Sequence, residues 1–269
     1  MRRIFLMIIA QVLFGWGLVK LYPKALPDSI GAFSSFELFS VIIIIILVVI
    51  AIIGNKRQAV GIQCFRTWKT FIHGLALLFP VSLIARVSYP GFDAIYAPQM
   101  GVGTIAGVIA LLWVMPILVL KEELFERSLN QSVLSTHFGR IPAIIALSLN
   151  FAFFHLLFVS WSFDLIIFAT IFLGSIVMAL AYEKSKSILV TLLIHLIYNV
   201  LLVFQTFWHA TGYVIQEYVF WIGYGIFFSF YAKKAITHLF PIFQERIRPS
   251  WSWLWLLGYA LIPLGLRLF

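Results

Sequence analysis

The chain has 269 residues, of which 62% are hydrophobic and only 11% are charged, and its formal net charge is +9. A soluble domain needs far more polar surface, because no single core of this size could bury so many apolar side chains. The bilayer must therefore be the solvent, and crossing it takes about 20 apolar residues in a helix. The positive charge lies between apolar runs, which indicates membrane topology and contact with anionic lipid and not with nucleic acid. The single cysteine, Cys64, excludes an intramolecular disulfide.

Apolar runs of helical length recur along the whole chain. The first follows Met1-Arg2-Arg3 and is predicted to be a retained helix, because no small-residue cleavage site follows it. None of the runs alternates as barrel strands do. The predicted spans are 4–22, 36–53, 68–85, 101–121, 141–158, 163–182, 187–207 and 213–231.

A further apolar segment, 251–269, contains Pro263 and Arg267 and either spans the membrane or lies in its interface. No linker or internal repeat divides the sequence. We therefore predict an all-α polytopic membrane protein of about eight transmembrane helices, plus this ninth segment, in one domain covering 1–269.

The distribution of basic residues predicts the orientation. If the eight spans alternate, only three of the 19 lysines and arginines fall on the side opposite the N-terminus, namely Lys20, Lys24 and Arg86, with Arg267 as a fourth if the last segment also crosses. Since basic residues are retained on the cytoplasmic side, we expect the N-terminus to be cytoplasmic.

Ionisable side chains at membrane depth are costly, so each one requires an explanation. The first such cluster, Lys121-Glu122-Glu123-Leu124-Phe125-Glu126-Arg127, directly follows the fourth apolar run. If the helix continues, Glu123 and Arg127 stack on one face and can pair. Glu122 is rotated by about 100° from Glu123, and its i+4 neighbour is Glu126, a like charge. A carboxylate without a cation in apolar surroundings tends to take up protons, which suits a general base.

The second and third clusters place histidines inside otherwise apolar helices. His155 ends the segment Phe151-Ala152-Phe153-Phe154-His155, and His195 precedes Asn199 by four residues. Residues four apart share a helix face, so His195 and Asn199 carry their polar groups in the same direction.

The three clusters can lie at one depth. Gly139 marks the predicted turn between the fourth and fifth spans, with Glu122 17 residues before it and His155 16 residues after it. If the fourth helix continues to this turn, the hairpin brings Glu122 and His155 to a similar level, and His195 starts from the same side of the membrane. Glu122, His155, His195 and Asn199 can therefore converge from three helices.

Each cluster alone has an ordinary explanation: a solvated helix end, a core histidine bonded to a carbonyl, or polar contacts between helices. Together they supply the side chains of a hydrolytic site. The remaining histidines lie near predicted helix ends or loops and receive no site role: His73, His137, His209 and His238.

In chain order the clusters read EExxxR, FxxxH and HxxxN, over a core of about 101–205. This ordered set resembles the CPBP family of intramembrane peptidases, which includes CAAX prenyl endopeptidases and bacteriocin-processing proteins. The motif residues are Glu122, Glu123 and Arg127; Phe151 and His155; and His195 and Asn199. The resemblance implies about eight helices around an intramembrane cavity, and hydrolysis of a peptide bond.

The resemblance also implies roles for these residues. Glu122 would be the base that activates water, assisted by His155, while His195 and Asn199 would stabilise the oxyanion or hold the water. The supporting residues would be Glu123, Arg127 and Phe151. A catalytic zinc held by Glu122, His155 and His195 remains an alternative, because these three donors would leave one coordination position of the metal free. The sequence has no HExxH, and we favour a site without a tightly bound metal.

We expect an endopeptidase in a prokaryotic plasma membrane, with the bilayer and a membrane-associated protein or peptide as its partners. The substrate classes are CAAX-type proteins, secreted peptides and C-terminal sorting tails. The alternative is a catalytically silent immunity or scaffold protein of the same fold. A transporter with a proton relay ranks third, since no inverted repeat is visible.

Overall fold

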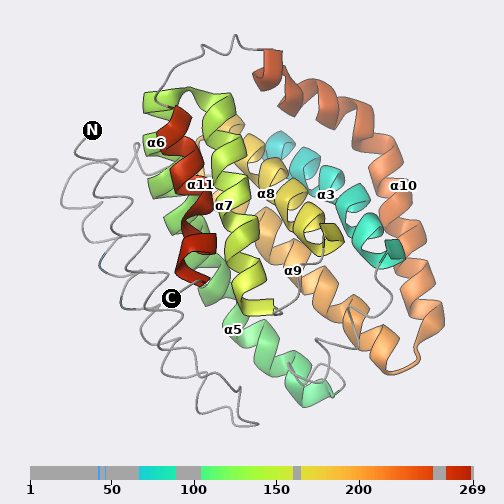
Figure 1. The fold of residues 1–269 in the computed structure, drawn as a ribbon. Helices are drawn as coiled ribbons and strands as arrows, with labels where there is room; N and C mark the ends of the chain where they lie inside the picture. Colours follow the sequence, from blue (N-terminus) through green and yellow to red (C-terminus); the bar gives the residue numbers. More distant parts are fainter. Residues whose placement is uncertain are drawn as a thin grey trace.

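The computed structural model describes residues 67–88, 104–159, 165–244 and 253–267, together with Ile42 and Ile46. Throughout this part of the chain the secondary structure is helical and no strand occurs (Figure 1), which confirms the all-α prediction for these residues. The predicted span 4–22, most of the span 36–53, and Cys64 lie outside the described residues.

The helices follow one another with short connections. In chain order they are α3 (Trp68–Ser88), α5 (Ile105–Glu123), the π-helix η1 (Leu124–Gln131), α6 (Ser132–Phe138), α7 (Arg140–Val159), α8 (Leu165–Ser185), α9 (Ile188–Ala210), α10 (Val214–Leu239), the 3-10 helix η2 (Phe240–Gln244) and α11 (Trp253–Arg267).

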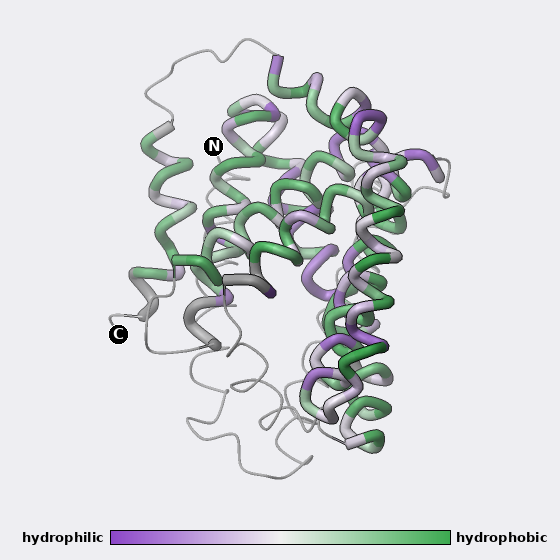
Figure 2. Tube along the Cα trace, turned by 90° about the vertical axis from the view of Figure 1, so that its right-hand side faces the viewer, coloured by the Kyte–Doolittle hydropathy of each residue, from purple (hydrophilic) through white to green (hydrophobic). Residues whose placement is uncertain are grey.

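Three of the described helical segments are long and apolar enough to cross a membrane: Ile105–Phe138, Leu165–Ser185 and Ile188–Ala210. Shorter apolar stretches occur in α3, α7 and α11. Figure 2 shows hydrophobic residues along much of each helix, interrupted by short hydrophilic segments. These features support a membrane-embedded protein, whereas the count of about eight spans stays a prediction.

The segment α5–η1–α6 is one continuous helix that carries the first polar cluster. Its N-terminus is capped by Thr104, whose Oγ1 accepts a hydrogen bond from the backbone N–H of Gly107 at 3.1 Å. It ends at Gly139, where φ is 90°, a left-handed value that favours glycine, and α7 begins at the next residue. The helix therefore continues past Arg127 to the turn at Gly139, as the depth argument required.

Helix α9 lies between α3 and α5, while α7 packs against α8 on one side and α11 on the other (Figure 1). Helices α3 and α9 approach closely at Gly74, where an added Cβ would lie 2.6 Å from Cδ1 of the fully buried Ile194. Only glycine fits this position without displacing Ile194. Helix α11 is tied to α7 by Asn150, whose Nδ2 donates to the carbonyl of Tyr259 at 2.7 Å.

At one end of the bundle, polar side chains from several helices contact Glu183 at the end of α8. Its Oε1 accepts hydrogen bonds from Gln131 Nε2 at 3.1 Å and from Ser135 Oγ at 2.8 Å. Its Oε2 pairs with Lys186 and lies 3.7 Å from Nε of Arg140. A single buried carboxylate thus joins η1, α6 and α7 to α8.

At the other end of the bundle, a smaller network of polar contacts joins three helices. Arg86 of α3 pairs with Glu217 of α10 at 2.7 Å, and His209 of α9 contacts both residues, at 2.8 Å from Arg86 and 3.3 Å from Glu217. Arg86 lies in the last turn of α3, so its predicted position at a helix end is confirmed, whereas its side of the membrane stays a prediction.

Candidate active site

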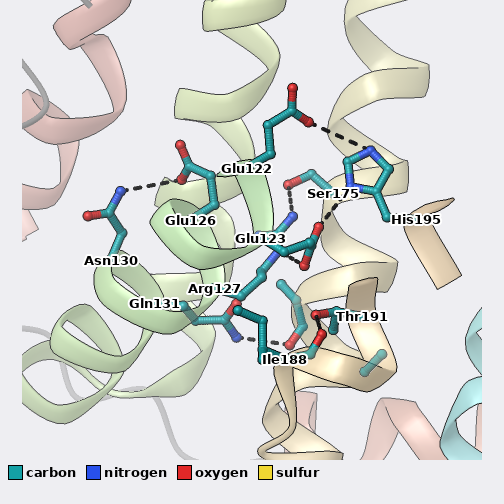
Figure 3. Close-up of polar contacts among 12 residues, drawn as sticks. Glu122, Glu123, Glu126, Arg127, Asn130, Gln131, Ser175, Ile188, Thr191 and His195 are labelled. Atoms are coloured by element: carbon teal, nitrogen blue, oxygen red, sulfur yellow. Dashed lines mark hydrogen bonds and ion pairs between the residues drawn. The ribbon is translucent and has the colours of Figure 1, made fainter. Parts of the chain in front are cut away.

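The first predicted cluster lies where α5 passes into η1, facing α9 (Figure 3). The last two residues of α5, Glu122 and Glu123, both approach His195 of α9. Glu123 and His195 are 72 positions apart in the chain, so their contact depends on the packing of α5 against α9.

The imidazole of His195 lies between the two carboxylates. Its Nδ1 is 2.8 Å from Oε1 of Glu123, and its Nε2 is 3.7 Å from Oε2 of Glu122. An ionised carboxylate only accepts hydrogen bonds, so Nδ1 carries the proton and donates a hydrogen bond to Glu123. In the neutral ring Nε2 is then an acceptor that faces Glu122 across a gap too long for a direct hydrogen bond.

The two glutamates differ in their access to solvent. The side chain of Glu123 is 2% exposed, whereas that of Glu122 is 28% exposed. Glu123 is therefore a buried anchor for the imidazole, and Glu122 is the carboxylate that an entering molecule can reach. A water hydrogen-bonded to both Oε2 of Glu122 and Nε2 of His195 would lie beside the line that joins these atoms, because 3.7 Å leaves no room for a water between them.

Arg127 holds Glu123 from the opposite side. Its fully buried guanidinium has Nε 3.8 Å from Oε2 of Glu123, and its Nη2 donates to Ser175 Oγ of α8 at 2.9 Å. The ring of Phe151 lies 5.7 Å below the guanidinium carbon. The predicted i,i+4 pairing of Glu123 and Arg127 is confirmed.

The second motif lies on α7 and meets the cluster through Phe151. The ring of Phe151 is 4.2 Å from that of His155 and 6.4 Å from that of His195. Nδ1 of His155 is 2.9 Å from the carbonyl oxygen of Phe151, and since a carbonyl only accepts, Nδ1 carries the proton. When the half-buried ring is neutral, its Nε2 is an acceptor.

Asn199 is the predicted site residue with the weakest connection to the others. It is half-buried one turn beyond His195 on α9. Among the described residues no hydrogen bond joins it to Glu122 or His155. The structure therefore brings six of the seven predicted residues together by direct contacts, and connects Asn199 only through its helix.

Two features of the site were not predicted. Ser175 of α8 accepts a hydrogen bond from Nη2 of Arg127, but a serine in an apolar run gives no sequence signal of such a role. Glu126 is 6% exposed and accepts a hydrogen bond from Asn130 Nδ2 at 3.5 Å (Figure 3). The sequence analysis noted Glu126 only as a like-charged neighbour of Glu122, because helical spacing does not reveal burial.

A metal site is not assembled in the structure. Among the described residues no group of three or more His, Cys, Asp or Glu side chains has the geometry to hold a metal ion, and these residues include Glu122, His155 and His195. The predicted zinc ligands as they lie here therefore do not fit the metal.

Apolar helices long enough to cross a membrane, with a buried cluster of glutamate, histidine and arginine between them, indicate an integral membrane protein. A model of the family described as type II CAAX prenyl endopeptidase Rce1-like matches residues 103–201, just over a third of the chain. This confirms the family resemblance predicted from the motifs, and the Rce1-like family is a protease family. Comparison with curated proteins and with solved structures gave no significant match.

Proposed function

We propose that the chain is an intramembrane endopeptidase that hydrolyses a peptide bond of a membrane-associated protein or peptide, with CAAX-type prenylated proteins as the first substrate class to test. One observation carries the proposal: His195 is anchored by Glu123 through Nδ1 while its Nε2 faces the accessible carboxylate of Glu122. The match of residues 103–201 to a protease family supports the same reaction.

The proposed first step is activation of a water that is hydrogen-bonded to both Oε2 of Glu122 and Nε2 of His195. Glu122 takes one proton from this water, and the resulting hydroxide attacks the carbonyl carbon of the scissile bond. The second hydrogen of the water is shared between the acceptor Nε2 atoms of His195 and His155, and in this way His155 assists by orienting the water. The apolar helices around the site strengthen these interactions, because little solvent screens them.

The second step is collapse of the tetrahedral intermediate. Its oxyanion receives a hydrogen bond from the amide of Asn199, after a shift of this side chain that brings it towards the substrate. The C–N bond breaks, and the proton held by Glu122 passes to the leaving amine. Glu122 returns to its carboxylate form, so one water is consumed and no other reactant is required.

The test compares the full-length chain with Glu122→Gln, which removes the base and nearly preserves the shape. Both are reconstituted in lipid vesicles with a farnesylated CAAX peptide, and membrane and secreted peptides from cells carrying each version are compared by mass spectrometry. The matched control is Glu217→Gln, the same change at the opposite end of the bundle.

Fragments that appear with wild type and with Glu217→Gln, but not with Glu122→Gln, would support the proposal and identify the cleavage site. Activity on other peptides but not on the farnesylated one would retain the endopeptidase and reject the CAAX-type substrate. Identical peptide sets in all three, with a wild-type phenotype in the Glu122 variant, would favour the silent immunity or scaffold protein.

A further inference from the structure

A second polar cluster lies away from the candidate active site, where the N-terminal end of α3 meets the C-terminal end of α10. His73 and Thr70 of α3 are 2% and 1% exposed. The ring of His73 lies 5.0 Å from that of His238 on α10, and Nε2 of His238 is 3.0 Å from Oγ1 of Thr70. The sequence analysis placed both histidines at helix ends without a role, so their contact is new.

Positive charge surrounds these two imidazoles from three helices. Lys69 of α3 and Lys234 of α10 act electrostatically on His73, and Lys184 of α8 and Lys69 act on His238. All three lysines are exposed. The groups that act on either histidine include no carboxylate. Burial first, and then the neighbouring His73, Lys184 and Lys69, lower the pKa of His238 below its ordinary value.

The cluster also contains a buried polar atom that lacks a hydrogen bond. Nδ1 of His73 is buried and has no hydrogen-bond partner among the described residues. Leaving such an atom unpaired costs free energy, so native proteins usually pair it with a ligand or water. Lys234 is held close by, with its ammonium 5.8 Å from the ring centre of Tyr231. Two imidazoles and three lysines without an acid form a site that attracts an anion.

The surroundings identify the kind of anion. The cluster lies at the end of the bundle that also holds Lys186 and Arg140, which is the predicted cytoplasmic side. Large apolar side chains are exposed beside it on α3, α10 and η2: Trp68, Ile236 and Phe240. A free anion would make no use of this apolar surface, whereas a phospholipid would cover it with its acyl chains.

We propose that Lys69, Lys184 and Lys234, with His73 and His238 beneath them, bind the phosphate of an anionic phospholipid headgroup at the predicted cytoplasmic surface. The lysines supply the charge, and the imidazoles donate hydrogen bonds to the phosphate oxygens when protonated. The bound phosphate offsets the repulsion that disfavours the charged imidazole, so the lipid binds more tightly as the pH falls. This inference does not depend on the proposed peptidase activity.

The test uses the full-length chain in detergent, titrated with phosphatidylglycerol or phosphatidylcholine and examined by native mass spectrometry. We expect retention of phosphatidylglycerol over phosphatidylcholine. Lys69→Gln, Lys184→Gln or Lys234→Gln should each weaken this binding about fivefold, since each lysine contributes separately to attraction of the headgroup. The matched control is Lys233→Gln, an exposed neighbour of Lys234 that does not act on either histidine.

A second measurement needs no variant. Phosphatidylglycerol, but not phosphatidylcholine, should raise the pKa of His238 in NMR titrations of histidine-labelled protein. The lipid assignment is wrong if inorganic phosphate alone produces this rise and displaces the lipid. Equal binding by the three lysine variants and wild type, or equal weakening by Lys233→Gln, would show that no site is built here.

Discussion

Nδ1 of His195 lies 2.8 Å from Oε1 of Glu123, and this contact joins α9 to the end of α5. The same carboxylate pairs with Arg127 through its other oxygen. Glu123 therefore holds the imidazole and is itself held by a buried cation. Its role differs from that of Glu122, although the two residues are adjacent in the sequence.

This difference predicts how Glu122→Gln and Glu123→Gln will diverge. Both should lower kcat on a cleaved peptide by about 10²- to 10⁴-fold, the first by removing the base and the second by releasing His195. Only Glu123→Gln leaves buried Arg127 without its partner, which should cost about 3 kcal/mol or more. Tryptophan fluorescence during thermal unfolding in detergent measures the second effect. Equal stability of the two variants would contradict the anchoring role of Glu123.

Arg127 should be more important for stability than for chemistry. Arg127→Met leaves the buried carboxylate of Glu123 unpaired, so we expect a loss of about 3–5 kcal/mol. Combining Arg127→Met with Glu123→Gln removes both charges and should recover part of this loss. A double-mutant cycle by thermal unfolding measures the coupling, and strictly additive losses would show that the two side chains do not interact.

Substitution of His137 is a matched control for substitution of His155. Nδ1 of His137 lies 2.8 Å from the carbonyl of Val133, the same i−4 contact that His155 makes with Phe151, but His137 is exposed beside the turn at Gly139. We expect His155→Ala to lower kcat by about 10²-fold or more and His137→Ala to leave it unchanged. Equal activities in the peptide assay would remove His155 from the mechanism.

Glu126 is expected to differ from Glu123 in its effect on stability. It is buried, but no arginine or lysine pairs with it among the described residues, and its hydrogen bond from Asn130 is long. Because an unpaired buried carboxylate is costly, Glu126→Gln should leave the unfolding temperature unchanged or raise it. A clear decrease, comparable with that of Glu123→Gln, would show that the charge of Glu126 contributes to the fold.

The sequence predicted the part of the site that depends on helix geometry. The pairing of Glu123 with Arg127 follows from their spacing on one helix, and the hairpin at Gly139 was the basis for expecting His155 at the depth of Glu122. The contact between Glu123 and His195 could not be predicted from the sequence, because it depends on how α5 and α9 are rotated about their axes. Helical spacing gives a direction around one axis and carries no information about the partner helix.

The cluster around His73 and His238 was missed for a related reason. Each histidine stands near the end of its helix, where a single residue is most often solvated. Their contact depends on the antiparallel packing of α3 and α10, whose sequences lie 168 residues apart at Thr70 and His238. The roles of the site residues, the number of spans and the orientation in the membrane stay predictions.

The π-helix between Glu123 and Ser132 makes the site sensitive to the length of the chain. The residues before it carry the two glutamates, and those after it include Ser135, which binds Glu183. Each residue turns the chain by about 100° in an α-helix and by somewhat less in a π-helix, which has more residues per turn. Loss or gain of one residue within 124–131 would therefore rotate the glutamates away from His195 while Ser135 kept its place. In this segment a deletion that spares every polar side chain should be more harmful than most substitutions, so relatives should differ here in residue type but not in spacing.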